Sequence, residues 1–326
     1  MDSSRAAELH TSHYALHITH YTLHLTQMKK AIYITLITLG IIIGFDFIIG
    51  AVSKKLVMAA PDAGLNQTNT AQALFNKKAD VLVLGSSRAN HHYVSSLFKD
   101  SLGLSCYNAG RDGHDILYAT MVLRSFLERC TPKLVITDLA GSMMDGSWIK
   151  SNKDMSCFYG ASQAVTEILD KDVLKGFDRL KMKSNLYRYN NTLEWIATAY
   201  LSNWGEGDGY FPMPVTNNGM KKVVRKDHKF TPHPKCLSYL DDIVKTCKEK
   251  DILLVLCVSP SMSFSMHGLN DWMKEYGAQH QIKTLDFTGD TTYVEHPEFF
   301  FDATHLNDKG ARIFTKEFIG RLKSKE

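Results

Sequence analysis

Residues 81–92 read VLVLGSSRANHH, an apolar run that passes directly into two serines, an arginine and two histidines. A short unbroken apolar run that ends at a turn is typical of a strand buried on both faces of a parallel sheet. Gly85 permits a sharp turn there, so the serines are expected at the carboxyl edge of the sheet. Ligands of open parallel sheets bind beyond that edge. The stretch therefore predicts a buried strand and a site at its end.

Similar apolar runs recur along the chain and alternate with helical stretches. Strands are predicted at 80–84, 104–108, 133–139, 252–259 and 283–287. Helices are predicted at 116–130, 236–250, 269–280 and 308–322. This alternation favours an α/β fold, in which helices cover both faces of a mostly parallel sheet of about five strands.

One long segment, residues 141–232, interrupts the alternation. It is rich in aromatic residues, glycine and asparagine, as in SNWGEGDGYFPMPVTNNG at 202–219, and it supplies no obvious core strand. We expect an insertion at the carboxyl edge of the sheet, where loops commonly build ligand sites. A surface excursion that only packs against the domain is the alternative.

The first 27 residues contain a near duplication, HYALHIT followed by HYTLHLT at 13–26. Its histidines would form one stripe on a helix, because they are spaced three or four residues apart. They are His10, His13, His17, His20 and His24. The stripe could bind a metal, but it lacks acidic partners. We therefore favour a non-native or disordered leader at 1–27, upstream of a true start at Met28.

A membrane anchor is predicted at residues 28–53. Two lysines precede 22 largely apolar residues, 31–52, and two more lysines follow them. A helix of that length covers roughly 30 Å at about 1.5 Å per residue, enough to cross a bilayer core. It exceeds the apolar region of a cleaved signal peptide, about 7 to 15 residues. We expect a single-pass signal anchor in the cytoplasmic membrane, a linker at 54–78, and the remaining chain on the periplasmic or extracellular side.

The composition disfavours nucleic acid as a partner and gives no sign of a zinc site or a disulfide scaffold. A net charge of +4, without clustered Lys and Arg, disfavours nucleic acid. The six cysteines form no C-x-x-C pair, so neither a zinc site nor a small disulfide scaffold is indicated, although one or two disulfides are possible in an exported protein. No metal or organic cofactor is expected, and the oligomeric state is left open.

A serine at the sheet edge needs a base to accept its proton and a group to orient that base. Such a pair occurs in FFFDATHLNDKG, where Asp302 and His305 lie three positions apart. On one turn, that spacing lets a carboxylate and an imidazole approach the same point. Asn307 or Asp308 can cap the helix that follows.

At these residues the chain resembles the SGNH or GDSL hydrolase superfamily of serine esterases, lipases and acetyl-ester hydrolases or transferases. GSS at 85–87 matches its Gly-Asp-Ser block, and DATH at 302–305 matches its closing Asp-x-x-His block. The resemblance implies Ser87 as nucleophile, His305 as base and Asp302 as the group that orients the base. It also implies a flavodoxin-like three-layer α/β/α sandwich.

A further match follows the second strand, where NAGRDG at 108–113 is similar to the family's Asn-Ala-x-x-x-Gly turn. It implies that the backbone N–H groups of Gly113 and Ser87 bind the oxyanion. The resemblance covers about residues 79–323 and leaves 141–232 unmatched.

The third block departs from the family. Instead of Gly-x-Asn-Asp, the chain has DLAGSMMD at 138–145, and losing one oxyanion donor can cost on the order of 100-fold in rate. Ser142 stands nearest the missing Asn; Arg88 and Asn90 are the other candidates for the donor. Arg88, Asn90 and Asn108 are also expected to line the substrate site.

We therefore predict a serine esterase acting on O-acetyl or other acyl esters of cell-envelope carbohydrates. A first block that begins GSSR, together with a third block that departs from the consensus, resembles the branch of this superfamily that modifies envelope polysaccharides. An O-acyltransferase on the same triad and a catalytically weak glycan-binding or envelope-assembly protein are alternatives. An α/β-hydrolase elbow is disfavoured, because its serine normally follows several strands. His91 and His92 are interpreted as helix-rim residues.

Overall fold

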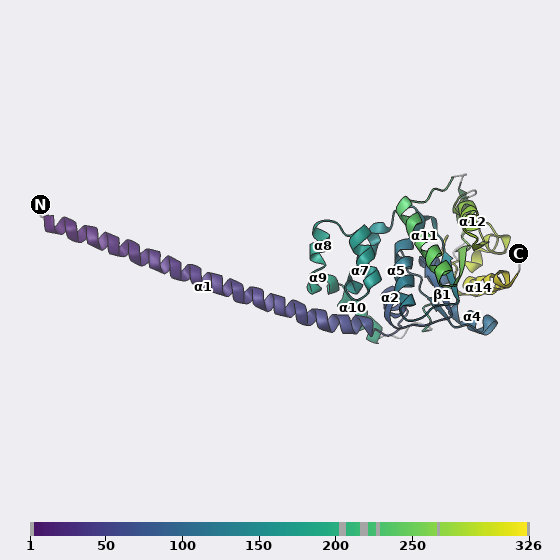
Figure 1. Ribbon diagram of the computed structural model, residues 1–326, viewed down its shortest axis with the longest axis horizontal. Coiled ribbons are helices and arrows are strands. Elements are labelled where there is room, and N and C mark those ends of the chain that lie inside the picture. Colours follow the sequence, from purple (N-terminus) through teal and green to yellow (C-terminus); the bar gives the residue numbers. More distant parts are fainter. Residues whose placement is uncertain (1–2, 202–206, 216–220, 226–228, 266–267, 325–326) are drawn as a thin grey trace. The chain divides into compact units, whose positions relative to one another are not determined.

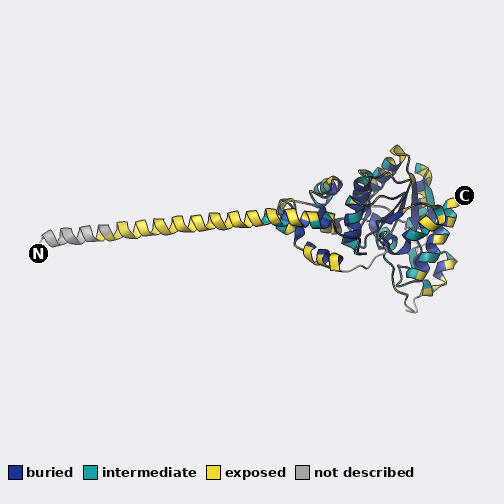
Figure 2. Ribbon diagram, turned by 90° about the horizontal axis from the view of Figure 1, so that it is seen from below, coloured by how far each residue is buried: buried dark blue, intermediate teal, exposed yellow. Residues whose placement is uncertain are grey.

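The computed structural model describes residues 3–201, 207–215, 221–225, 229–265 and 268–324, and it divides into two units, 1–51 and 52–326. The described residues of the first unit, 3–51, lie within helix α1 (Ser3–Met58). In the described ranges α1 is the one helix long and apolar enough to cross a membrane, and its side chains from Leu16 to Gly44 are exposed (Figure 2). It is consistent with a single-pass membrane anchor. The side chains of 1–12, 14 and 15 lie outside the described part, so the His10 position of the stripe does too.

The second unit is built on a five-stranded parallel sheet in the order β2-β1-β3-β5-β7 (Figure 1). Its strands are β1 (Val81–Gly85), β2 (Cys106–Asn108), β3 (Leu134–Asp138), β5 (Leu253–Val258) and β7 (Lys283–Asp286). All five predicted strands are confirmed to within two residues at each end. The order is flavodoxin-like, with the topological switch point between β1 and β3, where ligand crevices form in such sheets.

Alternation within the strands divides the core into two layers. Leu82 and Leu84 of β1 point into one apolar cluster, and Val81 and Val83 point into the other. The first cluster is covered by α5 (Ile116–Leu127), α11 (Pro234–Glu249) and α12 (Leu269–His280). The second is covered by α3 (Ser87–His92), α4 (Ser95–Leu102) and α14 (Asp308–Lys323). The predicted three-layer α/β/α sandwich is confirmed.

The prediction of a linker at 54–78 is wrong, because this segment contains helix α2 (Asn66–Phe75). The helix packs into the first apolar cluster through Ala71 and Leu74. Its polar residues Thr68, Asn69 and Thr70 are also buried. Asn69 Nδ2, for example, donates to the carbonyl of Gly209 at 2.8 Å. Buried polar side chains with internal partners give no apolar periodicity, so the pattern of the sequence concealed this helix.

The segment 141–232 consists mainly of short helices. They are α6 (Gly141–Met144), η1 (Ile149–Phe158), α7 (Gln163–Ile168), η2 (Leu169–Val173), α8 (Phe177–Lys181), α9 (Asn185–Tyr189) and α10 (Thr192–Leu201). Strand β4 (Val223–Arg225) pairs with β6 (Ser263–Ser265) in a separate sheet. The described part of the segment thus adds no strand to the main sheet; positions 202–206 and 216–219 of the quoted stretch lie outside it.

Two short helices, α13 (Thr291–Val294) and η3 (Pro297–Phe299), precede the turn at Asp302–His305, which α14 follows. All six cysteines carry free thiols, so the disulfides considered for an exported protein are not formed.

Candidate active site

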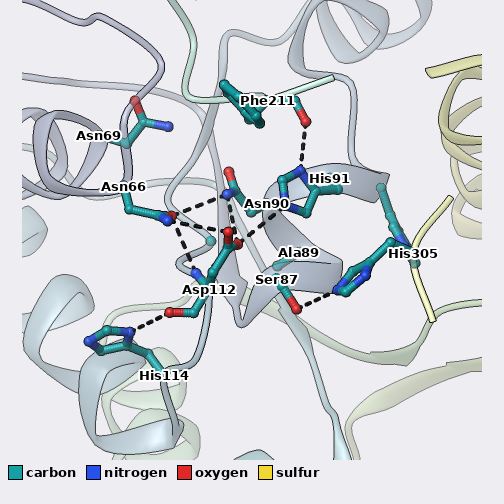
Figure 3. Close-up of polar contacts among 12 residues, drawn as sticks. Asn66, Asn69, Ser87, Ala89, Asn90, His91, Asp112, His114, Phe211 and His305 are labelled. Atoms are coloured by element: carbon teal, nitrogen blue, oxygen red, sulfur yellow. Dashed lines mark hydrogen bonds and ion pairs between the residues drawn. The ribbon is translucent and has the colours of Figure 1, made fainter. Parts of the chain in front are cut away.

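The turn after β1 delivers Ser87 to the carboxyl edge of the sheet. Gly85 has φ +149°, and a Cβ at this position would lie 2.7 Å from Ala89 Cβ and 2.8 Å from Asp138 O, so the turn requires glycine. Ser86 follows as the buried N-cap of α3, and Ser87 is the first residue of the helix. Ser87 Oγ lies 2.7 Å from Nε2 of His305, although 218 positions separate the two residues (Figure 3).

The other side of His305 faces a carboxylate. Nδ1 of His305 lies 2.8 Å from Asp302 Oδ2, and Oδ1 of Asp302 accepts the backbone N–H groups of Thr304 and His305 at 2.8 and 2.9 Å. Burial opposes ionisation of Asp302, but the hydrogen bonds from His305 and Thr304 prevail and lower its pKa. The carboxylate favours the proton on Nδ1, so Nε2 presents its lone pair to the Ser87 hydroxyl.

His92 does not lie on the rim of its helix, as the sequence suggested, but is fully buried beneath the site. Its Nε2 accepts the backbone N–H of Leu306 at 2.9 Å, and its Nδ1 lies 3.0 Å from Ser259 Oγ. Nδ1 therefore carries the proton and donates to Ser259. Burial, with smaller contributions from His305 and Arg88, holds the pKa of His92 well below its usual value. A neutral ring thus fixes the backbone next to His305.

His91 is buried as well, which corrects the same expectation. Its Nδ1 donates to the carbonyl of Phe211 at 2.8 Å, and its Nε2 lies 3.3 Å from Asp112 Oδ1. Asn90 Nδ2 donates to the same carboxylate at 2.9 Å (Figure 3). Burial opposes ionisation of Asp112, but His91 and Asn90 outweigh it and hold its pKa well below the usual range. This network positions the loop that carries Gly113.

On its other side, Gly113 is followed by His114, whose ring is anchored at both nitrogens. Nδ1 donates to the carbonyl of Asp112 at 2.8 Å, and Nε2 lies 2.8 Å from Asp154 Oδ1. Arg111, 2% exposed, also binds Asp154 at 2.8 Å. Gly113 has φ +69°, and nothing lies within 4 Å of where its Cβ would be. The contacts of His114 and Arg111 thus hold the loop in place, while Gly113 itself faces open space.

Ser87 and His305 open onto a pocket of about 1100 Å³. Gly113 and Ser142 line the same pocket, so the three expected oxyanion donors meet at one cavity. Its apolar wall comes from the insertion, from strand β6 and from the first residue of α12. These side chains are Trp148, Met213, Phe230, Phe264 and Leu269. Several serines, at 259, 261, 263 and 265, line the pocket as well.

Of the three residues expected at the substrate, only Arg88 lines the pocket. Asn108 is fully buried: its Nδ2 donates to the carbonyls of Ala89 and Tyr93, at 2.7 and 2.9 Å, so it holds the turn together. Asn90 is 3% exposed and bound to Asp112. Both asparagines support the site from beneath, which corrects their expected role.

The sequence missed a buried ion pair at the switch point. The parallel register places Gly85 opposite Asp138, the last residue of β3. Arg88, the second residue of α3, then reaches Asp138 at 3.6 Å and donates to the carbonyls of Leu139 and Ser259. Burial raises the pKa of Asp138, against the opposing charge of Arg88. The only signal in the sequence was a charged residue that closes an apolar strand.

Among the described residues no three His, Cys, Asp or Glu side chains come close enough to share a metal ion.

Comparison with known proteins does not identify the chain. No family model matches the chain, and no curated protein matches it. Among solved structures, a candidate acylhydrolase from Bacteroides fragilis NCTC 9343 is similar, with a TM-score of 0.38 and 14% sequence identity over 80% of this chain and 98% of that chain. So distant a likeness assigns no activity to this chain, and the function is argued from the site.

Proposed function

We propose that the chain is a serine hydrolase of the SGNH or GDSL type that cleaves acyl esters through Ser87, His305 and Asp302. The observation that carries this is the continuous hydrogen-bonded line from Ser87 Oγ through the two nitrogens of His305 to Asp302, open to a pocket. Nucleophile, base and orienting group each have a partner at hydrogen-bonding distance, which is the geometry that activates a serine.

The reaction begins when Nε2 of His305 takes the proton of Ser87 and Oγ attacks the ester carbonyl carbon. The carbonyl electron pair moves to oxygen, and the backbone N–H groups of Ser87 and Gly113 stabilise the oxyanion. When the intermediate collapses, the C–O bond to the alcohol breaks and His305 gives its proton to the leaving oxygen. Water, deprotonated by His305, then attacks the acyl-enzyme. As the bond from the acyl carbon to Ser87 Oγ breaks, His305 returns the proton to Oγ, which releases the acid and restores the free serine.

Ser142 is the third oxyanion donor in this proposal. It lies in the pocket, at the second residue of α6, near where the family carries its asparagine. Arg88 is a poorer candidate, because its guanidinium already binds two carbonyls and pairs with Asp138. Asn90 is a poorer one still, because it is buried and bound to Asp112.

The substrate in this proposal is an acyl ester of a carbohydrate in the cell envelope. A pocket of about 1100 Å³ far exceeds what an acetyl group fills, so it has room for the alcohol part of the ester. Its mixture of aromatic faces and serine hydroxyls suits a ring with apolar faces and polar edges. The long apolar α1, if it anchors the chain, would restrict the enzyme to substrates at a membrane. Transfer of the acyl group to a sugar hydroxyl instead of water would use the same triad.

A catalytically weak, glycan-binding protein is the second candidate, and the replacement of the family's Asn by Ser142 favours it. The two are separated by assaying the full chain in detergent for p-nitrophenyl acetate hydrolysis, beside Ser87→Ala and the matched control Ser86→Ala. An esterase loses turnover in Ser87→Ala and keeps most of it in Ser86→Ala. Equal rates in wild type and Ser87→Ala would remove the esterase proposal. Faster acetyl transfer to an added oligosaccharide than to water would identify a transferase.

A further inference from the structure

The helices α8, α9 and α10 carry an unusual concentration of exposed apolar side chains. Ten large apolar residues beyond α1 are exposed in the described part of the chain, and six of them fall between 177 and 201. They are Phe177, Leu180, Tyr187, Leu193, Tyr200 and Leu201, exposed by 36% to 87%. We call these six residues the α8–α10 face. Such a concentration of exposed apolar side chains in one part of a domain is typical of a contact surface.

Basic residues are frequent in the same part of the chain. Residues 175–201 contain five Lys or Arg residues against two acidic ones. One of the acids, Asp178, is already paired with Lys153 and Lys181. Lys181 also lies over the rings of Phe177 and Tyr187, at 5.3 and 5.5 Å from their centroids. Apolar and aromatic side chains intermixed with cations suit the headgroup region of an anionic membrane.

The chain itself brings this face close to the expected membrane. The predicted span ends at Val52, and the residues just beyond it bind the same region at two points. Tyr200 of α10 donates its hydroxyl hydrogen to the carbonyl of Ala59 at 3.3 Å. Lys54 donates to the carbonyl of Gly160 at 3.4 Å, beside Tyr159, whose carbonyl accepts from Arg188 of α9. The seven positions from Val52 to Ala59, nearly all within α1, cover about 10 Å, so Tyr200, near the end of α10, lies within about that distance of the end of the predicted span.

We propose that the α8–α10 face docks on the anionic lipid headgroups of the membrane that α1 spans. Lipid is the occupant that the observations favour, because the face combines apolar and basic side chains and is attached within about 10 Å of the end of the span. Figure 1 shows α8, α9 and α10 grouped together, whereas α12 and α14 lie across the domain. Docking would hold the domain in one orientation on the membrane surface.

The test uses the full chain in nanodiscs made with brominated lipids, which quench tryptophan emission on contact. Leu201→Trp places a probe on the face, and Lys316→Trp places a matched probe on the exposed side of α14. Ile37→Trp, within the span, shows whether α1 is inserted. In phosphatidylglycerol bilayers the emission added by Leu201→Trp is expected to fall at least twofold, and that added by Lys316→Trp to stay unchanged.

The charge contribution is tested with Lys175→Glu combined with Lys183→Glu, which should restore most of the Leu201→Trp emission. Phosphatidylcholine bilayers should quench it less than phosphatidylglycerol bilayers. Equal quenching of Leu201→Trp and Lys316→Trp would overturn the proposal and leave the face to a protein partner. Equal quenching in both lipids would overturn the assignment to anionic lipid, and an unquenched Ile37→Trp would remove its premise.

Discussion

Two histidine-bearing regions meet at the pocket, the turn 302–305 and the end of α3. The rings of His305 and His92 have centroids only 6.4 Å apart. His305 reaches the pocket and has a carboxylate behind it, so its Nε2 can gain and lose a proton. His92 is fully buried and has a serine hydroxyl and a backbone N–H as partners. The same side chain is thus suited to proton transfer in one place and to rigid support in the other.

The comparison predicts the largest loss for Asp302→Asn, which removes the charge that orients His305. We expect turnover of p-nitrophenyl acetate to fall on the order of 10²- to 10⁴-fold, because an amide no longer enforces the proton on Nδ1. Thermal unfolding should change little, since the Asp302 side chain is 45% exposed. Steady-state rates and a melting curve measure both. A rate within threefold of wild type would show that Asp302 does not orient the base.

His92→Leu tests the supporting role. It removes the acceptor of the Leu306 N–H, and a buried unpaired donor costs about 1 to 3 kcal/mol of stability. We expect kcat to fall roughly 10- to 100-fold with KM little changed, because His305 would shift by a fraction of an ångström. His92→Gln, which can still accept that hydrogen bond, should recover much of kcat. If the two variants lose kcat equally, His92 does not act through the backbone at Leu306.

Ser142→Ala is expected to have a smaller effect. Removing one oxyanion donor of good geometry costs about 10²- to 10³-fold, and a short hydroxyl beside two backbone donors should contribute less, roughly tenfold in kcat. Ser261→Ala, at another serine of the pocket wall, is the matched control and should alter KM more than kcat. Unchanged kcat in Ser142→Ala would leave only the N–H groups of Ser87 and Gly113 as donors.

The smallest predicted effect is the contribution of His92 to the pH dependence of stability. Burial depresses the pKa of His92 in the folded chain, so below about pH 6.5 the unfolded chain binds a proton that the folded one does not. Wild type should therefore lose stability as pH falls below that value, by up to about 1.4 kcal/mol per pH unit from this residue. His92→Gln should lose less over the same range. Parallel denaturation curves at pH 7.5 and 5.5 for the two proteins would contradict a neutral, buried His92.

The same comparison explains what could be predicted from the sequence. The strands were predictable because VLVLG and its counterparts are apolar without interruption. The contact between Ser87 and His305 was predictable because the serine and the Asp-x-x-His pair occupy positions set by the strand order. The roles of His91 and His92 were not predictable from the sequence. Their burial depends on α14 and on the turn that carries Leu306, which cover α3 only in the folded chain. The Arg88 and Asp138 pair depends on strand register, which no local pattern contains. Helix α2 was hidden by polar residues that find partners only in the folded chain.

Covalent trapping of the nucleophile tests the central proposal most directly. The full chain is treated with a fluorophosphonate, and the modified residue is located by peptide mass spectrometry, with His305→Ala as control. The proposal predicts a single adduct on Ser87 in the wild-type protein and on the order of 10³-fold slower labelling in His305→Ala. An adduct on Ser86 or elsewhere, or labelling of Ser87 at the same rate without His305, would contradict it.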